Sequence, residues 1–438
     1  MSFRPLTPRM RQIPARKSAV LSALDVGASK IVCLIARLTP VSLAEAKGGR
    51  SHRAKVLGIG HQRSRGVKAG AIVDLDAAEN AIRLAIDAAE RMAGVEVDNL
   101  IVNMSGGRLS SKLYSAKIAI HGKAVQESDL HKALETAAAA SAKAGRATLH
   151  ALPLSYWLDA TAGVREPLGM VGHEFGAQLH VGSCDAAPAH NLMLAVERCH
   201  LRVAAVVATP YAAGLATLIG DEAELGAALV DFGGGTTSVG VFAGGRLTHI
   251  DAVAVGGNHI TMDIARGLNV TLADAERLKT LYGACIPSPS DDRDTIAVNR
   301  VGDDPDQPSH LPKSELVRII RPRAEEILEL VRDRLKAAGQ SAHVGRRLVL
   351  AGGACQLTGL PELARVIVSK QVRVGRPIGV EGLPESAASP AFAAAVGLLA
   401  YPQVAGLEHF EPRRQGIAGA EGEDGYVARV GRWLKESF

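Results

Sequence analysis

The 438-residue sequence has few of the features that mark specialised classes of protein. Only 3% of its residues are aromatic, so alanine, valine, leucine and isoleucine must fill the core. A hydrophobic content of 47% and a charged content of 22% exclude an intrinsically disordered chain and a coiled coil. The formal net charge is only +5 and no basic run is interleaved with aromatic residues, so we expect no nucleic-acid partner.

Cysteine is scarce, with five scattered residues and no Cys-x-x-Cys pair. This pattern excludes a disulfide framework and a zinc site, and it indicates a reducing compartment. Long hydrophobic runs are absent too, since the uncharged stretch 386–407 has an apolar centre of only residues 391–401. A membrane-spanning helix needs about 20 apolar residues, so we expect a buried helix there. Residues 1–17 are basic and lack an apolar segment, which predicts a disordered basic arm and not a signal peptide.

Two stretches of the chain each contain an apolar strand, a glycine turn and a second strand. The first spans residues 19–38 and the second begins at residue 225. Their similarity predicts a duplicated α/β architecture with a cleft between two lobes. Residues 105–183 surround an alanine-rich helix with short strands, which predicts a small α+β module inserted into the first lobe. Residues 286–312 hold five prolines and two acidic clusters, so we expect an exposed loop.

The glycine turns carry residue types that bind phosphate. Glycine lets a backbone turn tightly and present its N–H groups to phosphate oxygens, and hydroxyl and ammonium groups add donors. Asp25 and Asp231 end the strands before the first two turns, and two facing carboxylates suit a hydrated Mg²⁺. Taken singly, such a turn is more often merely structural, and the P-loop pattern Gly-x-x-x-x-Gly-Lys-[Ser/Thr] is absent. The candidate phosphate-binding residues are Gly27, Ala28, Ser29, Lys30, Gly233, Gly234, Gly235, Thr236 and Thr237.

A third glycine turn, Ala351-Gly352-Gly353, completes an ordered set. Asp25 and Asp231 are 206 residues apart, and Gly352 follows 121 residues later. This order and spacing resembles the actin-like (ribonuclease H-like) ATPase superfamily, which implies a two-lobed α/β fold with ATP and Mg²⁺ between the lobes. A Glu-x-x-Lys pair shares one helix face; alone it suggests a solvated ion pair, but in the superfamily such a pair lies against the adenosine. The resemblance implies adenosine contacts from Glu276, Lys279, Gly352, Gly353, Ala354 and Gln356.

Further motifs resemble one branch of that superfamily, the bacterial cell-division family FtsA, over residues 18–438. The inserted module at 105–183 corresponds to the family's own extra subdomain. The resemblance implies a protein that binds ATP and tethers filaments of FtsZ, the tubulin-like ring protein, at the division septum. The motifs are Gly27-Ala28-Ser29-Lys30-Ile31-Val32, Ser64-Arg65-Gly66 with Gly70 and Asp74-Leu75, Val102-Asn103-Met104-Ser105-Gly106, Ala195-Val196-Glu197-Arg198-Cys199, the Asp231 turn, and Ala394-Ala395-Val396-Gly397-Leu398-Leu399.

One departure from the superfamily concerns catalysis. Its chaperone members carry Glu-Pro where this chain has Thr209-Pro210, and that glutamate helps to position the attacking water. Asp231 is the obvious carboxylate left near the water. We therefore expect ATP binding with slow or negligible hydrolysis, so that nucleotide acts as a switch for conformation or polymerisation.

The carboxyl terminus has the pattern of a membrane-binding helix. A polar linker, 402–425, precedes residues 426–438, in which apolar residues share one helix face and basic residues flank it. Such a helix suits the headgroup layer of an anionic bilayer, whereas the commoner fate of a terminal helix is to dock on its own domain. The linker, the basic flanks and the family's use of this helix favour the membrane. The candidate membrane-binding residues are Tyr426, Val427, Arg429, Val430, Arg432, Trp433, Leu434, Lys435 and Phe438.

The remaining expectations concern partners. In the family, the smaller subdomain of the second lobe receives the FtsZ tail, which implies contacts from Arg318, Arg321 and Arg323; a solvated basic face is the alternative. The resemblance also implies actin-like self-association, recruitment of later division proteins, and a place on the cytoplasmic face of the inner membrane. Two other functions stay open: a pilus-assembly protein of the PilM type, and a small-molecule kinase of the same superfamily. The terminal helix argues against both.

These observations divide the chain into parts. We expect a basic arm at 1–17, a first lobe at 18–104 and 184–222, the inserted subdomain at 105–183, a second lobe at 223–257 and 345–401, its smaller subdomain at 258–344, a linker at 402–425, and the terminal helix at 426–438.

Overall fold

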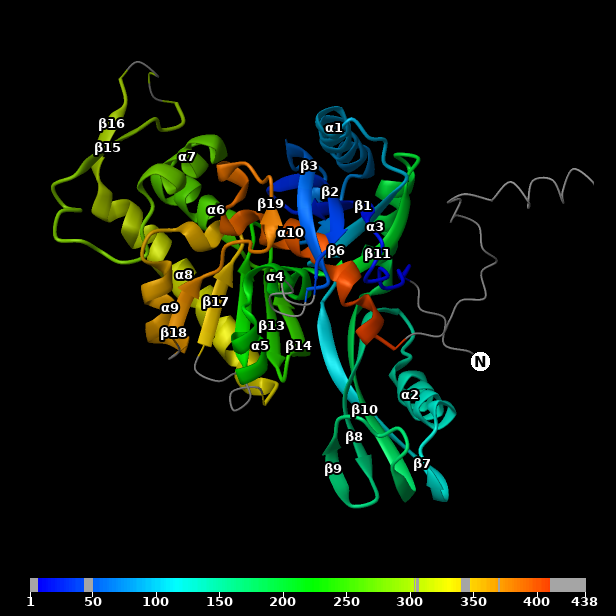
Figure 1. Cartoon of the computed structure of the whole chain (residues 1–438). Coiled ribbons are helices and arrows are strands. Elements are labelled where there is room, and N and C mark those ends of the chain that lie inside the picture. The colour runs from blue at the N-terminus through cyan, green and yellow to red at the C-terminus, as the bar shows by residue number, and fades with distance from the viewer. Residues whose placement is uncertain are drawn as a thin grey trace, which may run out of the picture.

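The computed structural model describes residues 7–42, 50–302, 304, 307–339, 347–368 and 371–409. Two lobes lie side by side, and a third unit extends away from the first of them (Figure 1). Within the described ranges, no helix is long and apolar enough to cross a bilayer.

A mixed sheet forms the centre of the first lobe. Its strands lie in the order β11-β6-β1-β2-β3-β19, with β1 antiparallel to β2 and parallel to β6. Nearly every residue of β1 and β2 that faces the core is alanine, leucine, isoleucine or valine, as expected of a chain poor in aromatics. The strands are β1 (Ala19–Val26), β2 (Lys30–Pro40), β3 (His52–Arg63), β6 (Asn99–Met104), β11 (Arg202–Ala208) and β19 (Val380–Glu381), with a small hairpin of β4 (Val67–Lys68) and β5 (Ala71–Ile72) beside them.

Helix α1 (Leu75–Ala93) shows how local sequence sets an element's ends. Asp74 caps it, because its carboxylate accepts a hydrogen bond from the N–H of Ala77 at 3.0 Å. Gly94 ends it with a left-handed φ of 64°, which a residue without a Cβ adopts freely. The other helices packed on this lobe are α3 (Ala186–Glu197), α4 (Thr209–Thr217) and α10 (Ala393–Ala400).

A second, longer sheet runs through the second lobe into the third unit. Its order is β18-β17-β12-β13-β14-β7-β10-β8-β9, and Asp251 of β14 pairs with Ser110 of β7 where the two parts of the sheet join. The second lobe contributes β12 (Ala227–Phe232), β13 (Thr237–Ala243), β14 (Arg246–Val253), β17 (Arg347–Ala351) and β18 (Gln371–Val374). Its helices are α5 (Gly220–Leu225), α6 (Gly257–Leu268), α7 (Leu272–Tyr282), α8 (Lys313–Ala337) and α9 (Leu360–Val368).

The third unit is the expected inserted module. Its sheet supports one helix, α2, and the two share a core of their own (Figure 1). Ala133, Ala137 and Ala138 of α2 are buried in that core, whereas Ala139 and Ala140 are exposed. The elements are β7 (Ser110–Ala124), α2 (Glu127–Ser141), β8 (Arg146–Leu158), β9 (Thr161–Val164) and β10 (Val171–Asp185).

The amino-terminal arm is not detached from the fold, at least from residue 7 onward, so the prediction of a disordered arm over 1–17 is wrong there. Thr7 is 1% exposed, and its hydroxyl donates to the carbonyl of Thr148 at 2.6 Å. Ile13 is 8% exposed, and its N–H donates to the carbonyl of Pro402 at 3.1 Å. Hydrophobic burial and distant backbone acceptors, neither visible in the local sequence, hold this segment.

The end of the described chain also differs from the expected boundaries. Residues 380–401, which we assigned to the second lobe, return to the first, where β19 pairs with β3 and α10 packs on α4. The expected linker begins later than residue 402, because the 3₁₀ turns Tyr401–Gln403 and Ala405–Leu407 pack against the first lobe and Glu408 is 8% exposed. Apolar burial over this stretch explains the difference.

The proline-rich segment 286–312 is not a plain loop. It contains a hairpin of β15 (Thr295–Val298) and β16 (Ser309–Pro312). Asp291 is 1% exposed; it accepts the N–H of Ser288 at 2.6 Å and pairs with Lys313 at 3.0 Å. An acidic cluster therefore contributes a buried anchor, which its composition did not suggest.

Candidate nucleotide-binding site

Two glycine turns meet where the lobes face each other. Each closes a strand hairpin: the N–H of Gly27 donates to the carbonyl of Lys30 at 3.0 Å, and that of Gly233 to Thr236 at 3.0 Å. The turns approach so closely that a Cβ on Gly235 would lie 2.7 Å from the Cβ of Ala28. Only glycine allows this approach, so the sequence requirement comes from the contact between the lobes.

Two buried carboxylates lie at the roots of these turns. Asp25 and Asp231 are the last residues but one of β1 and β12, and they are 7% and 8% exposed. Burial raises the pKa of Asp25 to about 6, against the opposing effects of Lys30 and Asn103. Burial, reinforced by the charge of Asp25, raises the pKa of Asp231 to about 7. The pair is thus a site of excess negative charge that favours a cation.

Lys30 brings a cation without a hydrogen-bond partner to the same place. Its ammonium is buried, no described group accepts a hydrogen bond from it, and it lies 3.4 Å from the centroid of the Phe392 ring. Burial lowers its pKa to about 8, against the opposing charges of Asp25 and Asp231. Burying an ammonium group without a hydrogen-bond acceptor costs free energy unless an anion binds to it, so this site is suited to a phosphate group.

A polar network orients Asp25. Asn103, at the end of β6, donates from its amide nitrogen to Asp25 at 2.6 Å and to the hydroxyl of Thr209 at 3.1 Å. Its amide oxygen accepts the N–H of Val26 at 2.7 Å. Thr209 is 3% exposed at the start of α4. Asn103 belongs to one of the sequence motifs, but the sequence did not indicate its role, because its contact with Asp25 depends on the pairing of β6 with β1 in the folded chain.

The third glycine turn packs against Asp231. Gly352 has a φ of +83°, and a Cβ there would lie 2.8 Å from a carboxylate oxygen of Asp231. Gly353 instead is exposed and open, since a Cβ there would meet nothing nearer than the Cβ of Ala391 at 3.7 Å. The 3₁₀ turn Gly353–Gln356 follows, and the amide of Gln356 donates to the carbonyl of Gly353 at 3.3 Å. This turn leaves open space where the adenosine is expected.

The Glu276–Lys279 pair belongs to the same site. The ammonium of Lys279 donates to Glu276 at 2.7 Å, to the hydroxyl of Thr261 at 2.8 Å and to the carbonyl of Gly257 at 3.2 Å. A Cβ on Gly257 would lie 2.9 Å from that of Ala354, so the start of α6 touches the third turn. The pair is therefore tied to the site and is not a solvated pair alone.

The structure thus brings all the candidate nucleotide-binding residues to one region between the lobes. Their role in binding remains a prediction. Among the described residues, no group of three or more histidine, cysteine, aspartate or glutamate side chains could hold a metal ion. The two carboxylates leave space for phosphate and water. This arrangement suits Mg²⁺, which keeps most of its bound waters, better than it suits a metal ion whose ligands all come from the protein. Residues that sequence reasoning missed are Asn103, Thr261 and Phe392.

The three arginines proposed for partner binding differ in their exposure and in their ion-pair partners. Arg318 and Arg321 lie one turn apart on α8 with side chains 74% and 46% exposed, and among the described residues each forms an ion pair with a glutamate of the same helix. Arg323 points elsewhere: its guanidinium donates to Asp263 on α6 at 2.6 Å and is 29% exposed. Arg323 thus joins two helices of the subdomain. The candidate membrane-binding residues, 426–438, lie outside the described residues.

Two solved structures share this architecture at low sequence identity. A PilM–PilN type IV pilus biogenesis complex matches with a TM-score of 0.60 at 16% identity, covering 87% of this chain and 98% of that chain. MreB5 of Spiroplasma citri bound to ADP matches with a TM-score of 0.51 at 13% identity, covering 89% and 97%. These likenesses confirm the predicted actin-like fold.

Relatives in sequence are much nearer. A cell division protein FtsA from Rhizobium meliloti is 52% identical over 98% of this chain and 98% of its own length. The chain belongs to the FtsA family of cell-division proteins. The FtsA of Escherichia coli K12 is 30% identical over 97% of this chain and 100% of its own length. A model of "Cell division protein FtsA" matches residues 228–397, and a model of the "SHS2 domain inserted in FTSA" matches residues 106–182.

The FtsA assignment decides between the functions that the sequence left open. The inserted module, expected at 105–183, is the SHS2 domain of the family. The likeness to PilM is one of fold, at 16% identity, and does not compete with a relative at 52%. A role in cell division is therefore established, and the pilus and kinase alternatives are not supported.

Proposed function

We propose that this FtsA chain binds Mg-ATP between its lobes and tethers FtsZ filaments to the cytoplasmic face of the membrane at the division septum. It associates with its own copies as actin-like protofilaments and recruits later division proteins. The observation that supports nucleotide binding is Lys30, because its buried ammonium has no hydrogen-bond partner among the described residues and lies beside two buried aspartates. MreB5, which shares the fold, has been solved with ADP and with AMPPNP.

Each part of the site has a definite task in nucleotide binding. The backbone N–H groups of the two facing turns and the ammonium of Lys30 bind the phosphates. Asp25 and Asp231 accept hydrogen bonds from the waters of Mg²⁺, whose charge keeps both carboxylates ionised. The Glu276–Lys279 pair and the open turn at Gly353 bind the adenosine. Because all three turns contact one another or α6, nucleotide binding stabilises the closed arrangement of the lobes.

Slow hydrolysis follows from what surrounds the phosphates. Thr209 occupies the position of the catalytic glutamate in the chaperone relatives, and its hydroxyl accepts a hydrogen bond from Asn103. A hydroxyl held in this way is a poor general base at neutral pH. Asp231 is the carboxylate that can orient water, which leaves turnover low and gives nucleotide the role of a switch.

The tether combines two separate surfaces. Residues 426–438 bind an anionic bilayer through Val430, Trp433, Leu434 and Phe438, with basic flanks adding on the order of 1 kcal/mol each. Arg318 and Arg321 on α8 present two exposed guanidinium groups to the acidic groups of an FtsZ tail. A 13-residue helix is marginal in water and folds on the lipid, so one copy binds weakly and self-association strengthens attachment by avidity.

Co-sedimentation of FtsZ with anionic vesicles tests the two surfaces separately. Trp433→Glu places a charge in the apolar face, so we expect loss of vesicle binding while FtsZ still binds in solution. Arg318→Glu with Arg321→Glu reverses two charges on α8, so we expect the chain to reach vesicles but leave FtsZ behind. Arg365→Glu reverses the charge of a half-exposed arginine on α9 that pairs with Glu362 and donates to the carbonyl of Val372; it serves as the control and should change neither.

Two results would contradict the proposal. Vesicle binding that survives Trp433→Glu would show that the terminal helix is not the anchor. FtsZ recruitment that survives both arginine reversals, with Arg365→Glu behaving alike, would remove α8 as the contact surface.

A further inference from the structure

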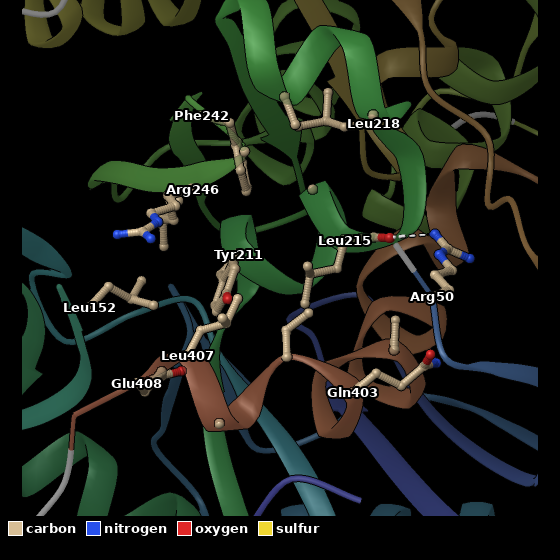
Figure 2. A pocket seen from close by; sticks show the side chains of 18 of the residues that line it. Arg50, Leu152, Tyr211, Leu215, Leu218, Phe242, Arg246, Gln403, Leu407 and Glu408 are labelled. Carbon is tan, nitrogen blue, oxygen red and sulfur yellow. Dashed lines mark hydrogen bonds between the residues drawn. The ribbon is translucent and has the colours of Figure 1, made fainter. Parts of the chain in front are cut away.

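A large cavity lies at the end of α4 that is remote from the nucleotide site. Its volume is about 810 Å³, and Leu215 and Leu218 from the last turns of α4 line it, whereas Thr209 at the first turn contacts Asn103 beside Asp25. Phe242 from the second lobe and Leu152 from the inserted domain complete an apolar wall (Figure 2). Three parts of the molecule therefore meet around this cavity, and no part of the proposed ATP site uses it.

Exposed apolar side chains surround the mouth of the cavity. Ile219, Ile378 and Leu407 all line it, although they are 50%, 38% and 53% exposed. Leu225, at the end of the adjacent helix α5, is 71% exposed. Apolar residues that gather around a hollow mark a binding surface more often than scattered ones do. The surface needs an apolar occupant.

The charges at the rim favour a basic occupant. Helix α5 carries Asp221 and Glu224 on its exposed side next to the lining residue Ile219. Glu224 is 54% exposed, with only a loose pairing at 3.7 Å to Arg165. On the other side Glu135, 42% exposed, lies near the lining residue His409 through their shared neighbour His131.

Two arginines inside the cavity do not reverse this preference. The guanidinium of Arg246 donates to the carbonyl of Pro153 at 2.7 Å, and that of Arg50 to the carbonyls of Ile378 and Leu215 at 2.7 Å each. They lie on opposite sides of the cavity (Figure 2). Because both guanidinium groups already donate to backbone carbonyls, an occupant with basic flanks still matches the acidic rim.

The chain itself supplies such a segment at the mouth of this cavity. Residues 406–409 line the cavity, and the next 29 residues follow directly. The last 13 of these, 426–438, combine an apolar face with the basic residues Arg429, Arg432 and Lys435. A random coil of 16 residues, the number between the two parts, has an end-to-end distance of about 20–24 Å, which corresponds to an effective concentration in the millimolar range.

We infer that residues 426–438 dock into this cavity when no membrane is present. This inference rests on the proposed function in one respect, since it gives the membrane-binding segment a second, competing site. The apolar face that enters the bilayer is the face that fills the cavity, so the two states exclude each other. The cavity thereby keeps Trp433 and Phe438 out of water and lowers the membrane affinity of the free protein.

Fluorescence of Trp433 in the full-length chain tests docking without any lipid. The chain has two tryptophans, so Trp157→Phe leaves Trp433 as the single reporter. We expect Trp433 emission at shorter wavelength than hydrated indole. Leu407→Glu, and independently Ile219→Glu, should move it to the hydrated value and increase acrylamide quenching several-fold. Both positions are at least half exposed, so the fold should persist; Val366→Glu, 77% exposed on α9, is the matched control.

Every outcome decides the inference. Hydrated Trp433 emission in the parent chain, or a spectrum that neither rim variant moves, overturns it. A blue-shifted emission that appears only at high protein concentration assigns the cavity to the segment of a second copy and overturns docking within one chain. If the docked form outnumbers the open form tenfold, the rim variants should bind anionic vesicles about tenfold more tightly than Val366→Glu. An unchanged vesicle affinity alongside a moved spectrum overturns the competition.

Failure of the membrane proposal is distinguishable from failure of docking. If vesicles leave Trp433 emission unchanged in every variant, the segment does not enter the bilayer. Docking is still decided by the lipid-free spectra, because these compare rim variants with Val366→Glu in buffer alone.

Discussion

His150 and Glu408 form a fully buried pair that joins the inserted domain to the end of the described chain. The imidazole Nδ1 lies 2.9 Å from a carboxylate oxygen of Glu408, and neither side chain has exposed surface. The backbone N–H of Ala208 donates to Nε2 at 2.8 Å, so the ring proton resides on Nδ1 and is donated to Glu408. The phenol of Tyr401 also hydrogen-bonds Glu408. This pair fixes the point from which the terminal segment leaves.

Removal of the His150 imidazole should destabilise the folded protein. His150→Ala leaves Glu408 as a buried carboxylate without its main partner, so we expect the free energy of unfolding to fall by about 3–5 kcal/mol. Glu408→Gln keeps an acceptor and should cost less. Urea unfolding measures both. Glu381→Gln, in an exposed pair with Arg53, is the control and should be almost neutral. Equal stability of His150→Ala and the parent would show that the pair does not hold this region.

The stability of the nucleotide-free protein should depend on pH through Asp231. Its folded pKa is raised to about 7 by burial, above the unfolded value near 3.8. The folded state therefore binds more protons between about pH 4 and 7, and stability falls as pH rises through that range. Asp231→Asn removes the free-energy cost of ionising this buried carboxylate, so it should stabilise the protein at pH 8 by roughly 2–4 kcal/mol. This stabilisation should disappear near pH 4.

Asp291 provides a control, because its pKa is shifted in the direction opposite to that of Asp231. Hydrogen bonds from Ser288 and Lys313 hold its pKa below the usual value, so its ionised form stabilises the fold above that range. Asp291→Asn should lower the thermal midpoint at pH 8, where Asp231→Asn raises it. If both variants lower the thermal midpoint, the ionised carboxylate of Asp231 does not destabilise the fold.

Gly353→Asp should abolish Mg-ATP binding without loosening the fold. A side chain there meets no atom nearer than 3.7 Å, so the nucleotide-free thermal midpoint should not change. The carboxylate instead occupies the adenosine space. We expect the rise in thermal midpoint that Mg-ATP gives the parent to vanish, and Asp231→Ala to lose it through the metal. An unchanged ATP-dependent rise in both variants would disprove the site.

Single-turnover measurements should give slow ATP hydrolysis. Thr209 is bound to Asn103 and offers no carboxylate, so Thr209→Ala should leave the rate at the parent's low value. A brisk rate in the parent, or a large fall in Thr209→Ala, would mean that the threonine takes part in the chemistry.

Those elements of the site that depend on a few adjacent residues can be predicted without any tertiary contact. A strand followed by glycine predicted each turn, and the order of the three turns indicated the fold before any contact was known. Asp74 and Gly94 define the ends of α1 through bonds that span three or four residues. The inserted domain was visible because its composition and periodicity differ locally from those around it.

The contacts between distant groups could not be predicted in this way, because they depend on how the whole chain packs. Phe392 lies under Lys30, Arg323 bonds Asp263 instead of facing solvent, and Thr7 bonds Thr148 across 141 residues. The return of α10 to the first lobe and the cavity beside Leu407 have the same origin. Periodicity states which face of an element is apolar, but the partner that covers this face is selected by packing of the whole chain, where the burial of many distant side chains outweighs local preference.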